Sequence, residues 1–495
     1  MTTITSLAKI GRAAAADLQP AIQGQVSQGQ VFQGQVFQGQ VFQGQVFPPS
    51  HEGHSELKLG SNGAEDHLPE DHLPTVIARC ETRKDVQLAV RTARAHGLAI
   101  SVSSGESGPI GRVLKRGGMV IDLSAMRHVA VDPATRVAIV AGGATVNDVV
   151  AAAAAHGLTP VTGNYGAVSL AGVTLAGGYG PLLGRYGLAA DNLLEVEIVL
   201  KNGQHAVANA GRNADLFWAL RGGAGDFGVT TSLRIRLHAL PSLLSGMIFY
   251  AWSDADLVFR GYSEIASSAS ECLTISAGIV SRTDGNPLLF AAPTWCGEPE
   301  EGERVLAALQ TFGTPVAANV GPVSYGDLLA MHDDHLASGS ISTKRSRPLP
   351  KLDSRVISAM IIAANARTSP LSAIVLHHFH GVPTRVRSEA TAFGPRREHF
   401  LLEAIAAWHP SANDNAASHR LWVQNVSDCA APKALIGDSG NQLWPGQRDL
   451  AARTPTNNRA RLSEVKQTYD PEYALSALHH RQRNNVFPRR ALPAS

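Results

Sequence analysis

Short apolar runs alternate with helix-like segments from about residue 74 onward. Residues 76–78 and 98–102 are apolar runs of the length and composition of strands. Between them, residues 82–96 place valine, leucine and alanine at helical spacing, and Gly97 is typical of the residue that follows a helix. A further apolar run at residues 119–123 predicts a third strand. This part of the chain is therefore expected to mix strands and helices.

Turn residues join several of the later strands. In HVAVDPATRVAIVAGG, Asp132-Pro133 begins a turn between two alternating segments, which predicts a hairpin. Asn202-Gly203, a strong hairpin signal, separates two further strands. Because hairpins join so many strands, the sequence predicts an α+β fold rather than a doubly wound parallel sheet. The other elements expected here are strands at 193–200, 205–208 and 229–237 and helices at 145–156 and 214–221.

The pattern changes after residue 240 and predicts a second α+β domain over residues 241–410. Its expected elements are strands at 247–251, 273–280, 288–292 and 373–379 and a helix at 301–312. Residues 411–478 are more polar and carry one expected helix at 459–468. Residues 479–495 form a basic segment that we expect to be a loose tail.

The N-terminal region contains a five-residue repeat with the sequence QGQVF. The repeat runs over residues 22–48, and its period matches neither a strand nor a helix. A segment with that period cannot align one apolar face for burial, so we expect disorder rather than a docking segment. Residues 1–72 are therefore excluded from the predicted core, and the first folded domain is assigned to residues 73–240.

Composition excludes several function classes. The chain has 495 residues, with 43 Lys+Arg and 41 Asp+Glu, so a net charge of +2 argues against a nucleic-acid-binding surface. No apolar run is long enough for a membrane span, and the N-terminus lacks a secretion-signal pattern, so we expect a cytoplasmic protein. The four cysteines include no C-x-x-C pair, which argues against zinc, iron–sulfur clusters and a disulfide framework.

A glycine-rich segment, GAVSLAGVTLAGGYGPLLGRYGL, covers residues 166–188. It is almost uncharged, and its missing side chains would let backbone N–H groups approach a flat or phosphorylated ligand. We prefer this ligand-binding interpretation to a turn-rich structural connection. The glycines concerned are Gly166, Gly172, Gly177, Gly178, Gly180, Gly184 and Gly187.

A second loop, SVSSGESGPIGR, follows the strand at residues 98–102. Its serine hydroxyls and freed amides would suit a pyrophosphate, although the Glu106 carboxylate would repel phosphate unless it points away. The other residues of this candidate nest are Ser103, Ser104, Gly105, Ser107 and Gly108.

Other motifs carry less weight. GAGDFG at residues 223–228 matches G-x-G-x-x-G, but a helix precedes it and a strand follows, which is the wrong order for a dinucleotide fingerprint. GDSGN at residues 437–441 resembles a serine-protease loop without a matching histidine, so a turn is preferred. HHFHG and MHDDH offer too few ligands on one face, and no metal site is predicted.

In this order, the segments resemble the flavin oxidoreductases of the vanillyl-alcohol oxidase and p-cresol methylhydroxylase (PCMH-type) superfamily. The most similar branch is that of the bacterial berberine-bridge-enzyme-like FAD oxidases. The resemblance covers about residues 74–478. The segments that carry it are MVIDLSAMRHVAVDPATRVAIVAGGA, VSLAGVTLAGGYGPLLGRYGLAADNLLEVEIVLKNGQ and NADLFWALRGGAGDFGVTTSLRIRLH, with PLLFAAPTWCGEPEEGE, RVRSEATAFGPRREHF and RLSEVKQTYDPE farther on.

The resemblance implies a PCMH-type FAD-binding domain in two pieces, with the α+β substrate domain inserted between them and residues 411–478 returning to the flavin site. It implies that Ser103, Ser104, Gly105, Glu106 and Ser107 contact the pyrophosphate. It also implies that five residues lie along the flavin: Gly172, Thr174, Gly177, Gly178 and Gly180. It implies that Asp226 and Val229 line the cofactor near the end of the domain.

The sequence departs from the family where relatives attach the flavin covalently. Relatives carry RGGGH, and an ungapped alignment places Ser103 at the arginine, Glu106 at the third glycine and Ser107 at the histidine. Serine cannot supply the imidazole bond, and residues 163–166 contain no cysteine for a second bond. The resemblance therefore implies non-covalent FAD, with an affinity that Glu106 lowers.

The implied reaction transfers a hydride from a CH–OH or CH–NH carbon of a small molecule to FAD, which oxygen or another acceptor reoxidises. Where relatives carry a Tyr-x-Asn motif, this chain has Ser439 and Asn441, and a neutral serine is a poor base. Another base (Tyr325, His378 or His380) is an alternative. A second hypothesis is a degenerate, non-catalytic binding protein of the same fold. Substrate and oligomeric state stay open.

Overall fold

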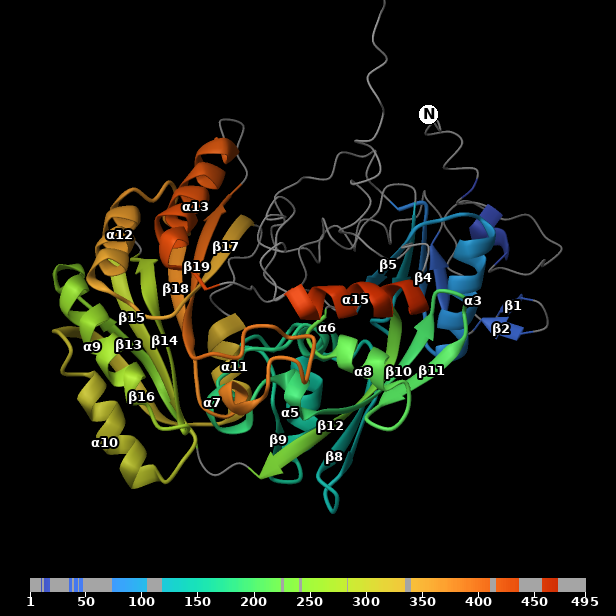
Figure 1. The fold of residues 1–495 in the computed structure, drawn as a ribbon, viewed down its shortest axis with the longest axis horizontal. Helices are drawn as coiled ribbons and strands as arrows, with labels where there is room; N and C mark the ends of the chain where they lie inside the picture. Colours follow the sequence, from blue (N-terminus) through green and yellow to red (C-terminus); the bar gives the residue numbers. More distant parts are fainter. Residues whose placement is uncertain are drawn as a thin grey trace, which may run out of the picture.

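The computed structural model describes residues 10, 13–17, 35–37, 40–42, 44–47, 74–104, 118–223, 227–239, 243–282, 284–333, 340–409, 415–435 and 456–470. These residues form two bodies that lie side by side (Figure 1). One contains a four-stranded and a six-stranded sheet, and the other contains a seven-stranded sheet. Sheets and helices occur in both, so the predicted α+β fold is confirmed.

The four-stranded sheet has the order β3-β4-β6-β5. Both β4 and β5 run parallel to β6. Helix α3 packs against this sheet and begins with a capping box in which Thr82 and Asp85 satisfy each other's backbone N–H groups. The elements are β3 (Gln45–Phe47), β4 (Val76–Arg79), α3 (Arg83–Ala95), β5 (Ile100–Ser103) and β6 (Met119–Asp122).

One copy of the N-terminal repeat belongs to the fold. Strand β3 pairs antiparallel with β4, and the Val46 and Phe47 side chains are buried. The prediction that residues 1–72 contribute nothing to the core is therefore wrong for these residues, because a single Val-Phe pair is enough to extend a sheet edge. Two other copies, β1 (Gln35–Phe37) and β2 (Gln40–Phe42), pair with each other.

The six-stranded sheet has the order β11-β10-β12-β8-β7, with β9 paired to β12. The expected hairpins β7–β8 and β10–β11 are both present. The strands are β7 (Val129–Asp132), β8 (Val137–Ala141), β9 (Leu158–Pro160), β10 (Leu193–Leu200), β11 (His205–Asn209) and β12 (Gly228–Ala239). The helices of this part are α5 (Val146–Ala154), α6 (Leu170–Leu175), α7 (Leu183–Tyr186) and α8 (Ala214–Leu220), with the 3-10 turn η2 at Ala189–Asn192.

The seven-stranded sheet is antiparallel throughout, in the order β16-β13-β15-β14-β18-β19-β17. Its strands are β13 (Leu243–Tyr250), β14 (Leu273–Ser281), β15 (Pro287–Trp295), β16 (Pro315–Val323), β17 (Ile341–Leu349), β18 (Ala373–Phe379) and β19 (His399–Trp408). The helices of this domain are α9 (Ala255–Ser267), α10 (Pro299–Leu309), α11 (Tyr325–Asp333), α12 (Ser354–Asn365) and α13 (Ala416–Ala430).

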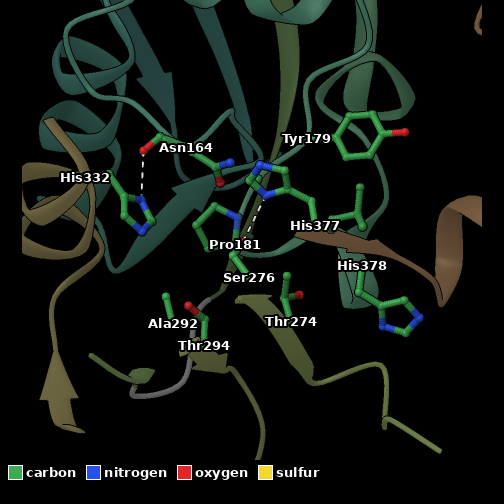
Figure 2. A pocket seen from close by; sticks show the side chains of 12 residues that line it. Asn164, Tyr179, Pro181, Thr274, Ser276, Ala292, Thr294, His332, His377 and His378 are labelled. Atoms are coloured by element: carbon green, nitrogen blue, oxygen red, sulfur yellow. Dashed lines mark hydrogen bonds between the residues drawn. The ribbon is translucent and has the colours of Figure 1, made fainter. Parts of the chain in front are cut away.

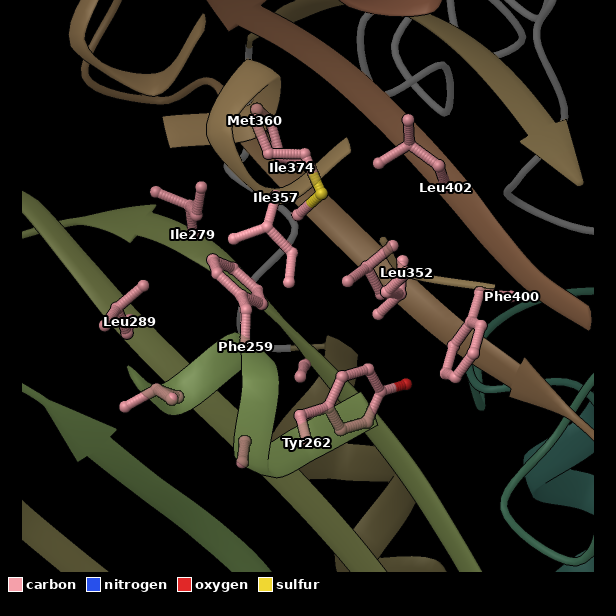
Figure 3. Packing of buried hydrophobic residues seen from close by; sticks show 14 of the residues in the cluster. Phe259, Tyr262, Ile279, Leu289, Leu352, Ile357, Met360, Ile374, Phe400 and Leu402 are labelled. Atoms are coloured by element: carbon pink, nitrogen blue, oxygen red, sulfur yellow. The ribbon is translucent and has the colours of Figure 1, made fainter. Parts of the chain in front are cut away.

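Helices α9, α12 and α13 cover one face of this sheet and bury the largest apolar cluster (Figures 1 and 3). Phe259 and Tyr262 of α9 lie in that cluster together with Ile357 and Met360 of α12. The Tyr262 ring meets the Phe400 ring edge-on, with 5.6 Å between centroids. The opposite face of the sheet is thereby left to face the other domain.

The C-terminal helix α15 (Thr456–Tyr469) returns to the first domain (Figure 1). It packs beside α8, and the Tyr469 hydroxyl donates to Asp215. Chain segments before and after the inserted domain therefore meet, as a two-part domain requires. Within the described part of the chain, no helix has the length and hydropathy needed to cross a membrane.

Candidate functional site

A pocket opens where the free face of the seven-stranded sheet meets residues 164–183 of the first domain (Figure 2). Its lining residues surround about 380 Å³ of space, a volume that includes open solvent. The sheet contributes side chains from β14, β15 and β18, and α11 contributes His332. The lining residues are Asn164, Tyr179, Gly180, Pro181, Leu183, Thr274, Ser276, Ala292, Thr294, His332, His377 and His378.

Strand alternation sends polar side chains to this face. Ser276 lies between the core residues Ile275 and Ala277, and Glu403 lies between the core residues Leu402 and Ala404. Because successive residues of a strand point to opposite faces, Ser276 and Glu403 must point away from the helices. The same alternation separates His377 from its neighbour His378, whose ring lies beside His380 and Phe400.

Four of these polar groups form a hydrogen-bonded row across adjacent strands. The Nδ1 atom of His377 lies 3.0 Å from the Ser276 Oγ, and its Nε2 lies 3.3 Å from the Glu403 Oε2. The other carboxylate oxygen of Glu403 accepts a 3.3 Å hydrogen bond from the Lys344 ammonium group. Ser276 is the direct cross-strand partner of His377, and the other pairs are diagonal neighbours.

Glu403 is ionised in this row although it is buried. Burial by itself would raise its pKa, but the Lys344 charge and the hydrogen bonds from His377 and Lys344 outweigh that effect. The pKa of Glu403 is thereby lowered to about 2. The row therefore holds a fixed negative charge directly behind a pocket-lining imidazole.

A rigid contact between the domains supports the pocket wall. Arg396, which precedes β19, forms two 2.8 Å bonds to the carboxylate of Asp191 in η2, and both side chains are buried. The Tyr179 ring packs against Phe379, and its hydroxyl lies 3.1 Å from His399 Nε2. His399 Nδ1 lies 2.6 Å from the Arg397 carbonyl oxygen and must donate to it, so Nε2 accepts from Tyr179.

The structure does not favour the three alternative bases considered from the sequence. Tyr325 is buried away from the pocket lining, 2.7 Å from the Thr162 hydroxyl, and burial raises its pKa. His378 lines the pocket, but its Nε2 lies 3.1 Å from Glu398, and burial lowers its pKa to about 4. His380 is buried against Gly184, and burial lowers its pKa to about 4 as well.

The two expected cofactor loops begin at the same edge of the first domain. The carbonyl oxygen of Ser103, at the end of β5, accepts a 2.8 Å bond from the N–H of Leu123. A Cβ on Gly143 would collide with the Leu123 carbonyl oxygen, so these two backbone segments lie in direct contact. The backbone N–H of Leu170 donates a 3.1 Å hydrogen bond to the carbonyl oxygen of Ala144. A short series of backbone contacts therefore joins the first loop to the start of α6 in the second.

The described residues beside these loops fit a ligand with hydrogen-bonding groups. The Thr174 hydroxyl on α6 and the Thr230 hydroxyl on β12 are buried without a hydrogen-bond partner among the described residues. Buried polar groups are rarely left unpaired, so such groups favour a ligand. Gly172 leaves open space, since the nearest atom to an added Cβ, in Ser169, is 3.8 Å away. FAD, as the sequence implies, fits these features.

Other glycines of the second loop serve packing inside the protein. Gly177 has φ of +120°, and an added Cβ would lie 2.7 Å from the Phe393 ring. A Cβ on Gly178 would lie 2.6 Å from Ala189, and one on Gly180 would collide with the Thr162 carbonyl. A side chain at these positions would point into the protein, so internal packing by itself accounts for glycine here. The contact of this backbone with a flavin stays a prediction.

The remaining predicted site residues fall into two groups. Val229 is fully buried in the cluster under α3, so its side chain packs inside the protein, and a cofactor contact at this residue stays a prediction. The others lie outside the described residues: Gly105, Glu106, Ser107, Asp226, Ser439 and Asn441. Among the described residues, no three His, Cys, Asp or Glu side chains cluster as metal ligands would.

Sequence reasoning missed Ser276, His377, Lys344 and Glu403. A usable signal was present, because a charged residue within the apolar run LLEAIAAW is unusual for a buried strand. The pairing of β14, β17, β18 and β19 decides which residues of other strands contact Glu403. The same pairing decides which face of the sheet the glutamate occupies.

Comparisons with known proteins agree with this architecture. The model of a family described as "FAD binding domain" matches residues 74–209. The (R)-6-hydroxynicotine oxidase of Paenarthrobacter nicotinovorans is 30% identical over 81% of this chain and 89% of its own length. An uncharacterized FAD-linked oxidoreductase of Bacillus subtilis is 28% identical over 81% of this chain and 91% of its own length.

Solved structures show the same fold. The crystal structure of 6-hydroxy-D-nicotine oxidase from Arthrobacter nicotinovorans superimposes with a TM-score of 0.79 at 25% identity, covering 88% of this chain and 97% of that one. The berberine-bridge-enzyme-like protein 28 of Arabidopsis thaliana, at 20% identity, has a TM-score of 0.77 and covers 87% and 96%. The chain therefore belongs to the FAD-linked oxidoreductases, and it has the fold of the berberine-bridge-enzyme-like proteins.

Proposed function

We propose that this protein oxidises a small molecule by removing a hydride from a CH–OH or CH–NH carbon, with FAD as the bound hydride acceptor. The observation that carries the proposal is the pocket between the two domains, which joins the glycine-rich loop of the FAD-binding domain to polar side chains of the substrate domain. FAD supplies the redox chemistry when bound, and the protein supplies orientation and electrostatics.

The chain's own residues suit that task. Asn164, Thr274 and Thr294 offer hydrogen-bonding groups on the pocket walls, while Pro181, Leu183 and Ala292 exclude water around a small substrate. A single pocket that combines apolar walls with a few convergent polar groups is typical of a small-molecule site. The relative named (R)-6-hydroxynicotine oxidase favours an amine as the first compound to test, and 6-hydroxynornicotine is the related amine that carries a CH–NH group.

We further propose that FAD is held without a covalent bond. An ungapped alignment supports this, because it places Ser107 where family members carry the attachment histidine. Residues 163–166 contain no cysteine that could form a second bond. The described residues that would hold the cofactor are Ser103, Ser104, Gly172 and Thr174, at the two loop ends that the fold brings together.

The absorbance spectrum of the purified protein tests both statements. A yellow protein whose flavin is released completely into the supernatant by acid precipitation supports non-covalent FAD. Colour that stays with the precipitate contradicts the attachment proposal alone. A colourless protein that takes up no added FAD contradicts the enzymatic function and favours the non-catalytic binding protein.

A further inference from the structure

The row Ser276–His377–Glu403 has the composition of a proton-accepting triad, and it lies in the pocket assigned to the substrate. This inference rests on the proposed function. Ser276 and His377 line the pocket, whereas Glu403 is 8% exposed and lies behind the imidazole. Figure 2 shows the His377 ring turned toward Ser276. The order from the pocket inward is therefore hydroxyl, imidazole, carboxylate.

The hydrogen bonds assign the protons in this row. Lys344 donates to one oxygen of Glu403 and keeps the carboxylate charged, so the other oxygen can only accept. Nε2 of His377, 3.3 Å away, must then carry a proton and donate it. In the neutral ring, Nδ1 keeps its lone pair and accepts the Ser276 hydroxyl at 3.0 Å.

We propose that Ser276 and His377 together accept the substrate's O–H or N–H proton, with Glu403 as the positioning residue. The substrate's O–H or N–H bond breaks, its proton moves to the Ser276 Oγ, and the serine proton moves to His377 Nδ1. FAD, when bound, would accept the hydride of the adjacent carbon, and the substrate would gain a C=O or C=N bond. The imidazolium that results faces the Glu403 carboxylate, as in catalytic triads.

Glu403 itself is a poor acceptor in this arrangement. A carboxylate whose pKa is lowered to about 2 has little tendency to take a proton at neutral pH. Its charge instead stabilises the imidazolium, which is the role of the acidic member of a triad. The pocket-facing imidazole therefore holds the proton.

Other titratable groups around the row do not replace His377. Tyr165 is 37% exposed, and its pKa is raised by desolvation of the phenol group and by the nearby charges of Glu403 and Asp333. His378, which also lines the pocket, has a pKa lowered to about 4 by burial, and its ring is stacked on His380 and Phe400. The other groups that face the pocket are His332, 3.0 Å from the Asn164 carbonyl, and Tyr179, 3.1 Å from His399.

Nitrogen NMR of the full-length protein tests the proton assignment without any turnover. In protein labelled with ¹⁵N-histidine, the His377 signals are identified by their loss in His377→Gln. We expect a ring with protonated Nε2 and unprotonated Nδ1 at neutral pH. We also expect Glu403→Gln to shift these signals, because the charged acceptor is gone. The opposite tautomer, or signals that Glu403→Gln leaves in place, would overturn the proposal.

Flavin reduction tests the catalytic role. Under anaerobic conditions, 6-hydroxynornicotine, a secondary amine with an N–H beside the reacting carbon, is mixed with FAD-loaded wild type, His377→Gln and Ser276→Ala. We expect His377→Gln to slow reduction by about 100-fold or more, the range of a lost general base, with unchanged FAD binding and unchanged reduction by dithionite. Ser276→Ala slows reduction less if water takes the place of the hydroxyl. His409→Gln, an exposed histidine at the end of β19, is the matched control and should behave as wild type.

The outcomes separate the two proposals. A wild-type protein that is reduced, with His377→Gln reduced equally fast across the pH range, overturns the proton acceptor alone. A wild-type protein that binds FAD and is not reduced contradicts the proposed CH–NH oxidation, and the NMR measurement then decides the proton arrangement by itself. A protein that binds no FAD contradicts the proposed function.

Discussion

The charge of Glu403 depends on residues of two other strands. Lys344 on β17 and His377 on β18 both contact its carboxylate, so its ionised form is stabilised only in the folded chain. The folded pKa of about 2 lies below the ~4.3 of an unfolded glutamate. Glu403 therefore stabilises the fold above that unfolded pKa, and this contribution is lost as the pH falls toward the folded pKa.

Replacing Lys344 with methionine tests this dependence. Without the ammonium group the effect of burial prevails, so the pKa of Glu403 rises and the fold loses about 1.5–3 kcal/mol at pH 7. The deficit should shrink as the pH falls through the raised pKa of Glu403 in the variant, because the variant's carboxyl group then takes up a proton that wild type, with its pKa of about 2, does not. Urea unfolding of both proteins between pH 7 and pH 3.5 measures it. Lys344→Arg keeps the charge and should stay near wild type; a deficit independent of pH would contradict the explanation.

Glu106 gives a second prediction at a single residue. Its carboxylate stands in the loop that is expected to meet the pyrophosphate, where like charges repel. Glu106→Gly should therefore tighten FAD binding, by about tenfold for ~1.4 kcal/mol of repulsion removed. Titration of the apoprotein with FAD measures the affinity. Glu301→Gln on α10, which also removes one exposed negative charge, should have no effect; weaker binding by Glu106→Gly would place the carboxylate away from the phosphates.

At the scale of elements, the second glycine-rich loop serves two purposes. Around Gly177 and Gly180 the backbone packs against Phe393 and the Thr162 carbonyl, which forms the corner between α6 and α7. At Gly172, on α6, there is open space, because an added Cβ would meet no atom closer than 3.8 Å. Gly177 and Gly180 therefore shape the pocket wall, and Gly172 leaves room for a ligand.

Two alanine substitutions separate these purposes. Gly180→Ala forces the backbone at Thr162 to move and should destabilise the protein by about 1–3 kcal/mol, as overpacking does. Gly172→Ala has space for its Cβ, so we expect unchanged stability of the apoprotein but weaker FAD binding. Thermal unfolding and FAD titration of both variants are the measurements. Equal destabilisation by the two substitutions would refute the distinction.

At the scale of the whole molecule, the two domains are joined by buried contacts. The Arg396–Asp191 pair connects the segment before β19 with η2, and Tyr179 packs on Phe379 beside it. The pocket lies next to these contacts, so its shape depends on how firmly the domains are held.

Arg396→Met should therefore weaken the joint. It leaves the Asp191 carboxylate buried without its partner, which costs about 3–5 kcal/mol when one member of a buried pair is removed. We expect a lower urea midpoint and an earlier loss of substrate-domain structure. Tryptophan fluorescence is the measurement of unfolding. Arg387→Met, which removes an exposed arginine from the same segment, is the control. A variant as stable as wild type would show that the pair does not hold the domains together.

Much of the fold could be predicted from the sequence. The hairpins at Asp132-Pro133 and Asn202-Gly203 and helix α3 follow from local turn, capping and spacing rules, which do not depend on distant residues. Strands β16, β17 and β19 and helices α9, α12 and α13 were not predicted. Their patterns are weaker: β17 reads ISTKRSRPL, and its charged residues find their partners only in the folded chain, Lys344 at Glu403 and Arg347 at Ser427.

The order of segments along the chain was sufficient to indicate a flavin oxidoreductase of this superfamily, because glycine-rich loops, hairpins and their spacing are properties of local sequence. The cytoplasmic location and the roles of Ser439 and Asn441 stay predictions. Tertiary structure alone decided that Ser276, His377, Lys344 and Glu403 meet, since they lie on four strands and become neighbours only through sheet pairing. It also decided that Val46 and Phe47 of the repeat join the core, because burial depends on which edge a short strand meets.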